Sequence, residues 1–251
     1  MHIIEEDFPV RGYESGVDNH VTLPTICNFL QEIAGNHAER LGFGIRELQA
    51  RDGTSWMLSR LHVKVGRFVS WGDVLYLKSW PSGIRGRLVA TRDFLGTDRE
   101  GAEVLEAVSD WLIVDLKALK IVKPSEDFKA LSAGEVTRVA LAESDGGGKF
   151  AALGKVDRTA RILVRRSDHD FNDHVNNVHY VEWALEAVPE AFRGRMPHGL
   201  DIVFRQAAHA GDELESRTEL VDADTLRHAI VRLSDNALLA TAETKWKGLM
   251  S

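Results

Sequence analysis

A twelve-residue segment that occurs twice decides the fold of this chain. Residues 10–21 read VRGYESGVDNHV and residues 164–175 read VRRSDHDFNDHV, so the two copies align without gaps at an offset of 154 residues. The alignment continues to Glu32 and Glu186, which are identical. Each copy contains a short extended run, a polar turn and an apolar stretch with helical spacing. Self-similarity of this kind indicates a duplicated structural unit.

Two further motif pairs follow the duplicated segment in the same order. Trp-Gly-Asp at 71–73 corresponds to Ala-Gly-Asp at 210–212, and residues 107–111 correspond to residues 242–246. Strand-like runs flank each Gly-Asp pair, which is typical of antiparallel strands joined by turns. We expect these strands at residues 61–69, 74–80, 202–208 and 214–221. Each half is therefore predicted to run in the order strand, helix, several strands.

The two predicted helices are unusually apolar. The first is expected to follow Thr22, with Pro24 in its first turn, and the second to follow Asn176 or Asn177 and to end before Pro189. Apolar side chains recur at helical spacing in both stretches, which predicts largely buried helices. A curved antiparallel sheet wrapped around such a helix is the hotdog arrangement. The expected fold class is therefore α+β, a tandem (double) hotdog with each half an antiparallel sheet around a long helix.

The chain length and a weakly patterned middle segment predict the domain boundaries. The 251 residues suit two units of roughly 110 to 130 residues each. Scattered charges, a proline and a glycine tract at 145–148 make the middle segment resemble a connection. We expect an N-terminal hotdog over residues 1–115, a linker over 116–158 and a C-terminal hotdog over 159–251 that carries the active-site motif.

Composition excludes several classes of function. The net charge of −7 argues against a nucleic-acid-binding protein, and no apolar run approaches the roughly 18 residues of a membrane span. The acidic N-terminus does not resemble a signal peptide. We expect a cytoplasmic monomer or homodimer without a cofactor.

The single cysteine, Cys27, excludes an internal disulfide. Its helical spacing favours a core residue over a nucleophile.

The polar turn of the second copy carries the densest group of chemically active side chains. Asp170 and His174 place a carboxylate near an imidazole, which can orient the ring and raise its basicity. The Asn172 amide and the free N–H groups of a helix start can stabilise an oxyanion. This set suits hydrolysis of an activated carbonyl by water. The first copy has Gly16 and Asp18 in place of Asp170 and Asn172, which indicates one working half and one half retained for shape.

Two alternatives remain open for this turn on residue types alone. Asp, Asn and His are common in turns and at helix caps, so the set can be purely structural. A metal site formed by His169, His174 and His179 with Asp170 is also conceivable, although the segment lacks a compact ligand spacing such as H-x-x-x-H.

The chain resembles the acyl-ACP thioesterases, the plastid fatty-acid-releasing enzymes and their bacterial relatives. The similarity is carried by DFNDHVNN at 170–177 and by the following VHYVEW at 178–183. Motifs in the first half that look like landmarks of the same family are SWMLSRLH at 55–62, WGDV at 71–74, RDF at 92–94 and SDWL at 109–112. Together these motifs extend the resemblance from about residue 8 to residue 246.

The resemblance implies a tandem hotdog that hydrolyses the thioester between a fatty acyl chain and acyl carrier protein. Asp170, Asn172 and His174 match the family's catalytic Asp, Asn and His. A strand glutamate of the family falls on Ala207 here. The adjacent Gln206 is expected on the opposite face of that strand, and so unable to replace the glutamate.

Two rival functions follow from the same residues. One is an acyl-CoA thioesterase that uses the same site, and the other is a non-catalytic acyl-thioester-binding hotdog protein, which Ala207 favours. An acidic carrier protein also requires a local basic surface on this acidic chain. Candidate residues for that surface are Arg85, Arg87, Arg92, Arg158, Arg161, Arg165 and Arg166.

Overall fold

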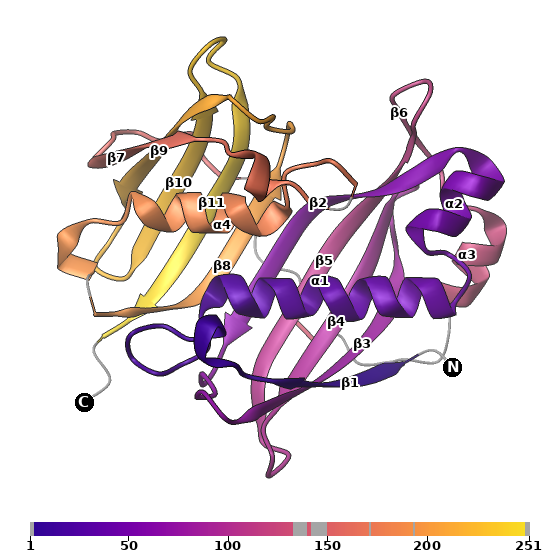
Figure 1. The fold of residues 1–251 in the computed structure, drawn as a ribbon, viewed down its shortest axis with the longest axis horizontal. Coiled ribbons are helices and arrows are strands. Elements are labelled where there is room, and N and C mark those ends of the chain that lie inside the picture. The colour runs from indigo at the N-terminus through magenta and orange to yellow at the C-terminus, as the bar shows by residue number, and fades with distance from the viewer. Residues whose placement is uncertain (1–2, 133–139, 142–149, 171, 193, 249–251) are drawn as a thin grey trace. The chain divides into compact units, whose positions relative to one another are not determined.

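The chain divides into two compact units, Met1–Glu143 and Ser144–Ser251 (Figure 1). The computed structural model describes residues 3–132, 140–141, 150–170, 172–192 and 194–248. The expected domain limits at residues 115 and 159 stay predictions, and the glycine tract at 145–148 lies outside the described residues. Within the described part of the chain, no helix is long and apolar enough to cross a membrane.

The first unit is an antiparallel sheet with a long helix across one face (Figure 1). The strand order is β1-β3-β4-β5-β2, and β6 pairs with the end of β5. Its strands are β1 (Ile4–Pro9), β2 (Thr54–Val65), β3 (Val74–Arg85), β4 (Val89–Thr97), β5 (Glu103–Asp115) and β6 (Lys120–Val122). Its helices are the 3-10 turn η1 (Gly12–Glu14), α1 (Leu23–Arg40), α2 (Ile45–Asp52) and α3 (Glu126–Ser132).

The second unit repeats this plan with shorter strands and a shorter helix (Figure 1). Its strand order is β8-β11-β10-β9-β7, and all neighbours are antiparallel. Its strands are β7 (Arg158–Leu163), β8 (Met196–Phe204), β9 (Glu213–Leu220), β10 (Thr225–Arg232) and β11 (Leu238–Lys247). Its helices are η2 (Arg166–Asp168), α4 (Asn177–Glu186), which lies across the sheet, and η3 (Glu190–Phe192).

The duplication extends to individual backbone hydrogen bonds. β1 and β7, like α1 and α4, begin 154 residues apart, which is the offset of the repeated sequence. In the turn before each helix, the N–H of Gly16 donates to the carbonyl of His20 over 2.8 Å, and the N–H of Asp170 donates to the carbonyl of His174 over 2.7 Å. Asn19 and Asp173 occupy the same left-handed conformation, with φ of 66° and 60°. The predicted α+β tandem hotdog is therefore confirmed.

Local sequence explains where the two long helices begin and which face is buried. The Thr22 side chain accepts the N–H of Thr25, and the Asn176 side chain accepts the N–H of Val178, so both expected caps are confirmed. The apolar face of α1 is buried, and each large side chain on it contributes about 1.5–3 kcal/mol. Cys27 lies on that face, and burial raises the pKa of its thiol to about 12. Cys27 is thus a core residue.

One predicted strand ends earlier than expected. β8 stops at Phe204, because the N–H groups of Arg205 and Gln206 both donate to the carbonyl of Leu239 and the chain then leaves the ladder. Gln206 and Ala207 therefore lie in the loop between β8 and β9. The expectation that these two side chains alternate on opposite faces of a strand is wrong.

Candidate functional site

The polar turn between η2 and α4 brings the three predicted site residues together. The Oδ1 atom of Asp170 accepts the N–H of Asn172 over 2.8 Å and the N–H of His174 over 3.4 Å. Among the described residues, the Asp170 carboxylate has no hydrogen bond to the His174 ring. Asp170 and Asn172 are half-buried, and His174 is exposed. The Asp170 carboxylate thus stabilises the turn by accepting hydrogen bonds from two backbone N–H groups of the turn. The chemical roles of all three residues stay predictions.

The backbone donors at the start of α4 are already in use. The N–H of Val178 donates to the Asn176 side chain, and the N–H of His179 donates to the Asn176 carbonyl, each over 3.0 Å. These two groups are therefore poor candidates for the oxyanion donors expected at this helix start. The Asn172 side chain, by contrast, makes no hydrogen bond within the described residues.

An imidazole–carboxylate pair lies in the same turn. His169 Nδ1 is 3.1 Å from Asp173 Oδ1. A carboxylate only accepts hydrogen bonds, so Nδ1 carries the proton and Nε2 is the acceptor in the neutral ring. The hydrogen bond from His169 holds the pKa of Asp173 below its usual value. Sequence reasoning considered His169 only as a metal ligand. The four-residue spacing between His169 and Asp173 was the available signal for this pair.

The geometry does not support the alternative metal site. His169 contacts Asp173, and His179 Nδ1 lies 2.7 Å from Glu182 Oε2, a hydrogen bond that raises the pKa of His179. Among the residues that the structure describes, no three His, Cys, Asp or Glu side chains gather as metal ligands do. His169 and His179 instead contact two separate carboxylates, those of Asp173 and Glu182.

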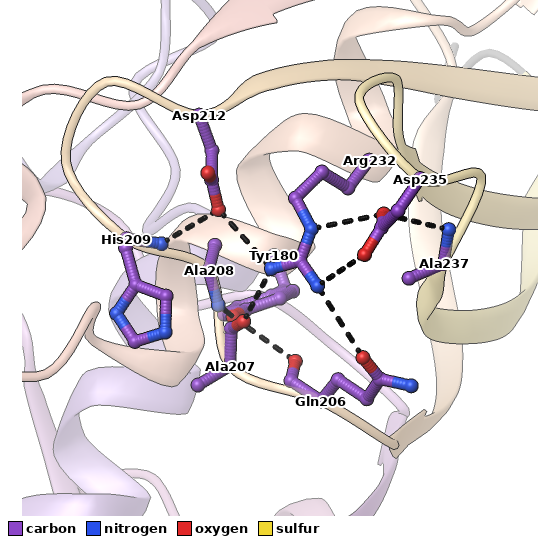
Figure 2. Close-up of polar contacts among 9 residues, drawn as sticks. All are labelled: Tyr180, Gln206, Ala207, Ala208, His209, Asp212, Arg232, Asp235 and Ala237. Atoms are coloured by element: carbon purple, nitrogen blue, oxygen red, sulfur yellow. Dashed lines mark hydrogen bonds and ion pairs between the residues drawn. The ribbon is translucent and has the colours of Figure 1, made fainter.

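The loop that contains Ala207 is attached to the first turn of α4 through Tyr180 (Figure 2). The Tyr180 hydroxyl accepts the N–H of Ala208 over 2.7 Å and donates to the carbonyl of Gln206 over 3.4 Å. Tyr180 and Ala208 are both buried. Because Tyr180 follows the polar turn within one helical turn, this contact places the β8–β9 loop beside the start of α4.

Arg232, at the end of β10, contacts the same loop (Figure 2). Its guanidinium donates to the Ala207 carbonyl over 3.4 Å, and it pairs with Asp212 over 3.3 Å and Asp235 over 3.0 Å. Its Nη2 atom also lies 3.5 Å from the side-chain oxygen of Gln206. No sequence pattern pointed to Arg232, because its partners come from two different loops.

The predicted basic surface needs correction. Arg92 is 8% exposed, and its Nη1 atom donates to His37 Nδ1 and Ser79 Oγ over 3.1 Å each, so it cannot contact a partner protein. Arg85 pairs with the buried Asp110, and Arg161 pairs with Glu215. The candidates that remain exposed are Arg87, Arg158, Arg161, Arg165 and Arg166.

Solved structures of acyl-ACP thioesterases share this fold. The 12:0-ACP thioesterase from Umbellularia californica superposes with a TM-score of 0.86 at 24% identity, over 98% of this chain and 97% of that one. An acyl-ACP thioesterase from Bacteroides thetaiotaomicron gives a TM-score of 0.85 at 21% identity, over 98% of both chains. These likenesses support the double hotdog fold.

Sequence relatives and family descriptions identify the family. The chloroplastic oleoyl-acyl carrier protein thioesterase of Coriandrum sativum is 29% identical over 94% of this chain and 68% of its own length. An acyl-[acyl-carrier-protein] hydrolase of Cuphea viscosissima is 29% identical over 96% of this chain and 62% of its own length. The chain thus spans about two thirds of these relatives. The acyl-ACP thioesterase N-terminal domain matches residues 2–131 and the C-terminal domain matches residues 153–248, so this chain belongs to the acyl-ACP thioesterase family.

Proposed function

We propose that this chain hydrolyses the thioester of fatty acyl-ACP and releases a free fatty acid and the carrier thiol. The observation that carries the proposal is the turn before α4. The turn has the same backbone hydrogen bond in both copies. Only the second copy, however, has Asp170 and Asn172 at the positions where the first has Gly16 and Asp18. A structural role common to both copies therefore does not explain these two residues. Family membership over both halves supports the thioester as substrate.

Each residue of the turn has a part in the proposed reaction. The Asn172 amide donates to the thioester carbonyl oxygen and stabilises the negative charge that develops there. Water attacks the carbonyl carbon as an imidazole accepts its proton, and His174, an exposed residue, is the acceptor that the sequence predicts. The Asp170 carboxylate stabilises the turn by accepting the backbone N–H groups of Asn172 and His174. The carbon–sulfur bond then breaks, and the sulfur takes up the proton.

Recognition of the carrier protein is part of the same proposal. Arg165 and Arg166 are exposed at the start of the polar turn, and Arg158 begins the preceding strand β7. Positive charge beside the turn complements an acidic carrier and accelerates its association. The acyl-CoA alternative uses the same turn but gains less from these arginines, because coenzyme A presents a much smaller surface.

A side-by-side turnover assay on acyl-ACP and acyl-CoA of several chain lengths tests this proposal. We expect a higher kcat/KM on acyl-ACP, and a value that falls as salt is added because salt screens the arginines. Replacing Asn172 by Ala should lower kcat by about 10²–10³-fold, the usual loss of one oxyanion donor. Asp18→Ala, at the equivalent position of the first copy, is the matched control and should retain turnover.

The outcomes separate the three functions. A higher kcat/KM on acyl-CoA would assign the chain to acyl-CoA hydrolysis. Binding of acyl thioesters without turnover would establish a non-catalytic binding protein. Equal activity of Asn172→Ala and Asp18→Ala would remove the polar turn from the chemistry.

A further inference from the structure

The first copy closes its polar turn against the loop between β2 and β3. The N–H of Val21 donates to the carbonyl of Val69 over 2.9 Å, and the N–H of Trp71 donates to the carbonyl of Asn19 over 3.0 Å. These two bonds pair the turn with the loop in the manner of a short antiparallel ladder. Val21 is 0% exposed in this closed arrangement.

The second copy leaves the same pairing open. The equivalent groups are the N–H of Val175 with the carbonyl of Ala208, and the N–H of Ala210 with the carbonyl of Asp173. Within the described residues, none of these four groups has a hydrogen-bond partner. We call the space between the two rows of groups the open seam. Val175 and Ala208 are 6% and 1% exposed, and buried backbone groups are nearly always paired, so both require a partner.

Side chains found only in the second copy bind the β8–β9 loop instead of the turn (Figure 2). The Tyr180 hydroxyl accepts the N–H of Ala208 over 2.7 Å, and Arg232 donates to the carbonyl of Ala207 over 3.4 Å. The first copy has Ile26 at the position of Tyr180, and this apolar side chain cannot form such a bond. The second copy therefore holds its loop in the open arrangement with its own side chains.

The open seam borders solvent on both sides. Exposed residues flank its two rows, namely Asp173 and His174 on the turn and Ala207, His209 and Ala210 on the loop. His174, the predicted proton acceptor, directly precedes the residue whose N–H lacks a partner. A ligand in the open seam therefore lies beside the predicted reaction centre.

The backbone groups of the open seam suit a secondary amide in an extended chain. A trans amide presents its N–H and its C=O on opposite sides, so it can accept from one row and donate to the other. Main-chain hydrogen bonds of this kind are how proteins bind extended peptides. Acyl-ACP and acyl-CoA both carry the acyl group on a pantetheine arm, an extended chain that contains such amides.

We propose that the open seam binds the pantetheine arm of the acyl thioester through the amide nearest the sulfur. The N–H of Val175 donates to the amide oxygen, and the amide N–H donates to the carbonyl of Ala208. Only a short ethylene link separates this amide from the sulfur, so the thioester carbonyl is held near Asn172 and His174. This inference rests on the proposed function, and His174 keeps its part as the proton acceptor.

The first test compares two inert thioethers as competitive inhibitors of acyl-ACP hydrolysis by the full chain. One joins an alkyl chain to N-acetylcysteamine, which has the amide, and the other joins the same alkyl chain to pentanethiol, which lacks it. We expect an inhibition constant about tenfold lower for the amide-bearing thioether, because the amide pairs with buried backbone groups. The pentyl compound is the more apolar one, so hydrophobic partition alone predicts the opposite order.

The second test removes the Val175 N–H by amide-to-ester replacement, which keeps the side chain. The same replacement at Val21 is the matched control, because each ester also weakens the carbonyl of a histidine that accepts a backbone N–H in its turn. The Val175 ester should abolish the tenfold difference between the thioethers and raise KM on acyl-ACP with less change in kcat. The Val21 ester should lower the melting temperature and retain the difference.

The possible results lead to different conclusions. Equal inhibition constants, or inhibition by neither thioether, would overturn the inference and leave the proposed function intact, because water would then fill the open seam. A Val175 ester that retains the tenfold difference would overturn it as well. The thioether comparison uses the parent chain, so it decides the question even where an ester variant does not fold. The parent kcat/KM on acyl-ACP and on acyl-CoA identifies the carrier that supplies the arm. A parent without turnover on any acyl thioester would refute the proposed function and, with it, this inference.

Discussion

Replacing Tyr180 by Phe removes one hydroxyl and isolates its contribution to the β8–β9 loop. That hydroxyl is the partner of the Ala208 N–H, and Ala208 is 1% exposed. Phe fills nearly the same volume, so the change adds no large cavity. The main cost is the buried N–H left without a partner, about 1–3 kcal/mol. In a unit of this size each kcal/mol corresponds to about 4 °C, so we expect the melting temperature to fall by about 4–12 °C.

The measurement pairs urea unfolding with hydrogen exchange at the Ala208 amide. Exchange at this amide should accelerate in Tyr180→Phe, because its acceptor has gone. Tyr76→Phe is the matched control, because the Tyr76 hydroxyl makes no hydrogen bond within the described residues. Unfolding free energies of the two variants within about 0.5 kcal/mol of each other would refute the reasoning. That result would mean that the loop is positioned without Tyr180.

Two further predictions concern buried titratable groups. Burial lowers the pKa of His228, which lies between the hydroxyls of Thr218 and Thr244, to about 3. The unfolded chain takes up this proton below pH 6.5, so stability is lost as the pH falls. The His228 contribution between pH 6.5 and pH 5 is about 1.5 kcal/mol. Urea unfolding of His228→Gln should show a correspondingly shallower pH dependence, and an unchanged slope would exclude this role. Because burial raises the pKa of Cys27 to about 12, we expect Cys27→Ala to keep its turnover on acyl-ACP and the folded parent to resist thiol reagents. Loss of turnover in a folded Cys27→Ala would restore the nucleophile hypothesis.

Structural features that depend on residues close together in the sequence were predictable from the sequence alone. The caps Thr22 and Asn176 are confirmed because a cap acts on N–H groups two or three residues away. The duplication was detectable because each copy must form the same turn, so the turn residues recur at one offset. The apolar spacing of α1 and α4 identified both buried helices, since each helix needs one apolar face against its sheet.

Features that depend on contacts between distant segments were not predictable. Arginine is usually a surface residue, so the sequence predicts that Arg92 is exposed. Only the tertiary structure brings its guanidinium, on β4, to His37 on α1. The end of β8 depends on the Leu239 carbonyl in β11, which accepts the successive N–H groups of Arg205 and Gln206. Neither partner is adjacent in the sequence, so no local pattern records these contacts.

The candidate site shows the same division. The sequence by itself determined that the turn before the second helix, with Asp170, Asn172 and His174, is where the two halves differ chemically. Only the tertiary structure decided which groups meet there: the Asp170 carboxylate contacts the backbone, and the Asp173 carboxylate contacts the ring of His169. The physical reason is that residue types set which hydrogen bonds are possible, whereas the left-handed backbone at Asp173 and the packing around the turn select among them.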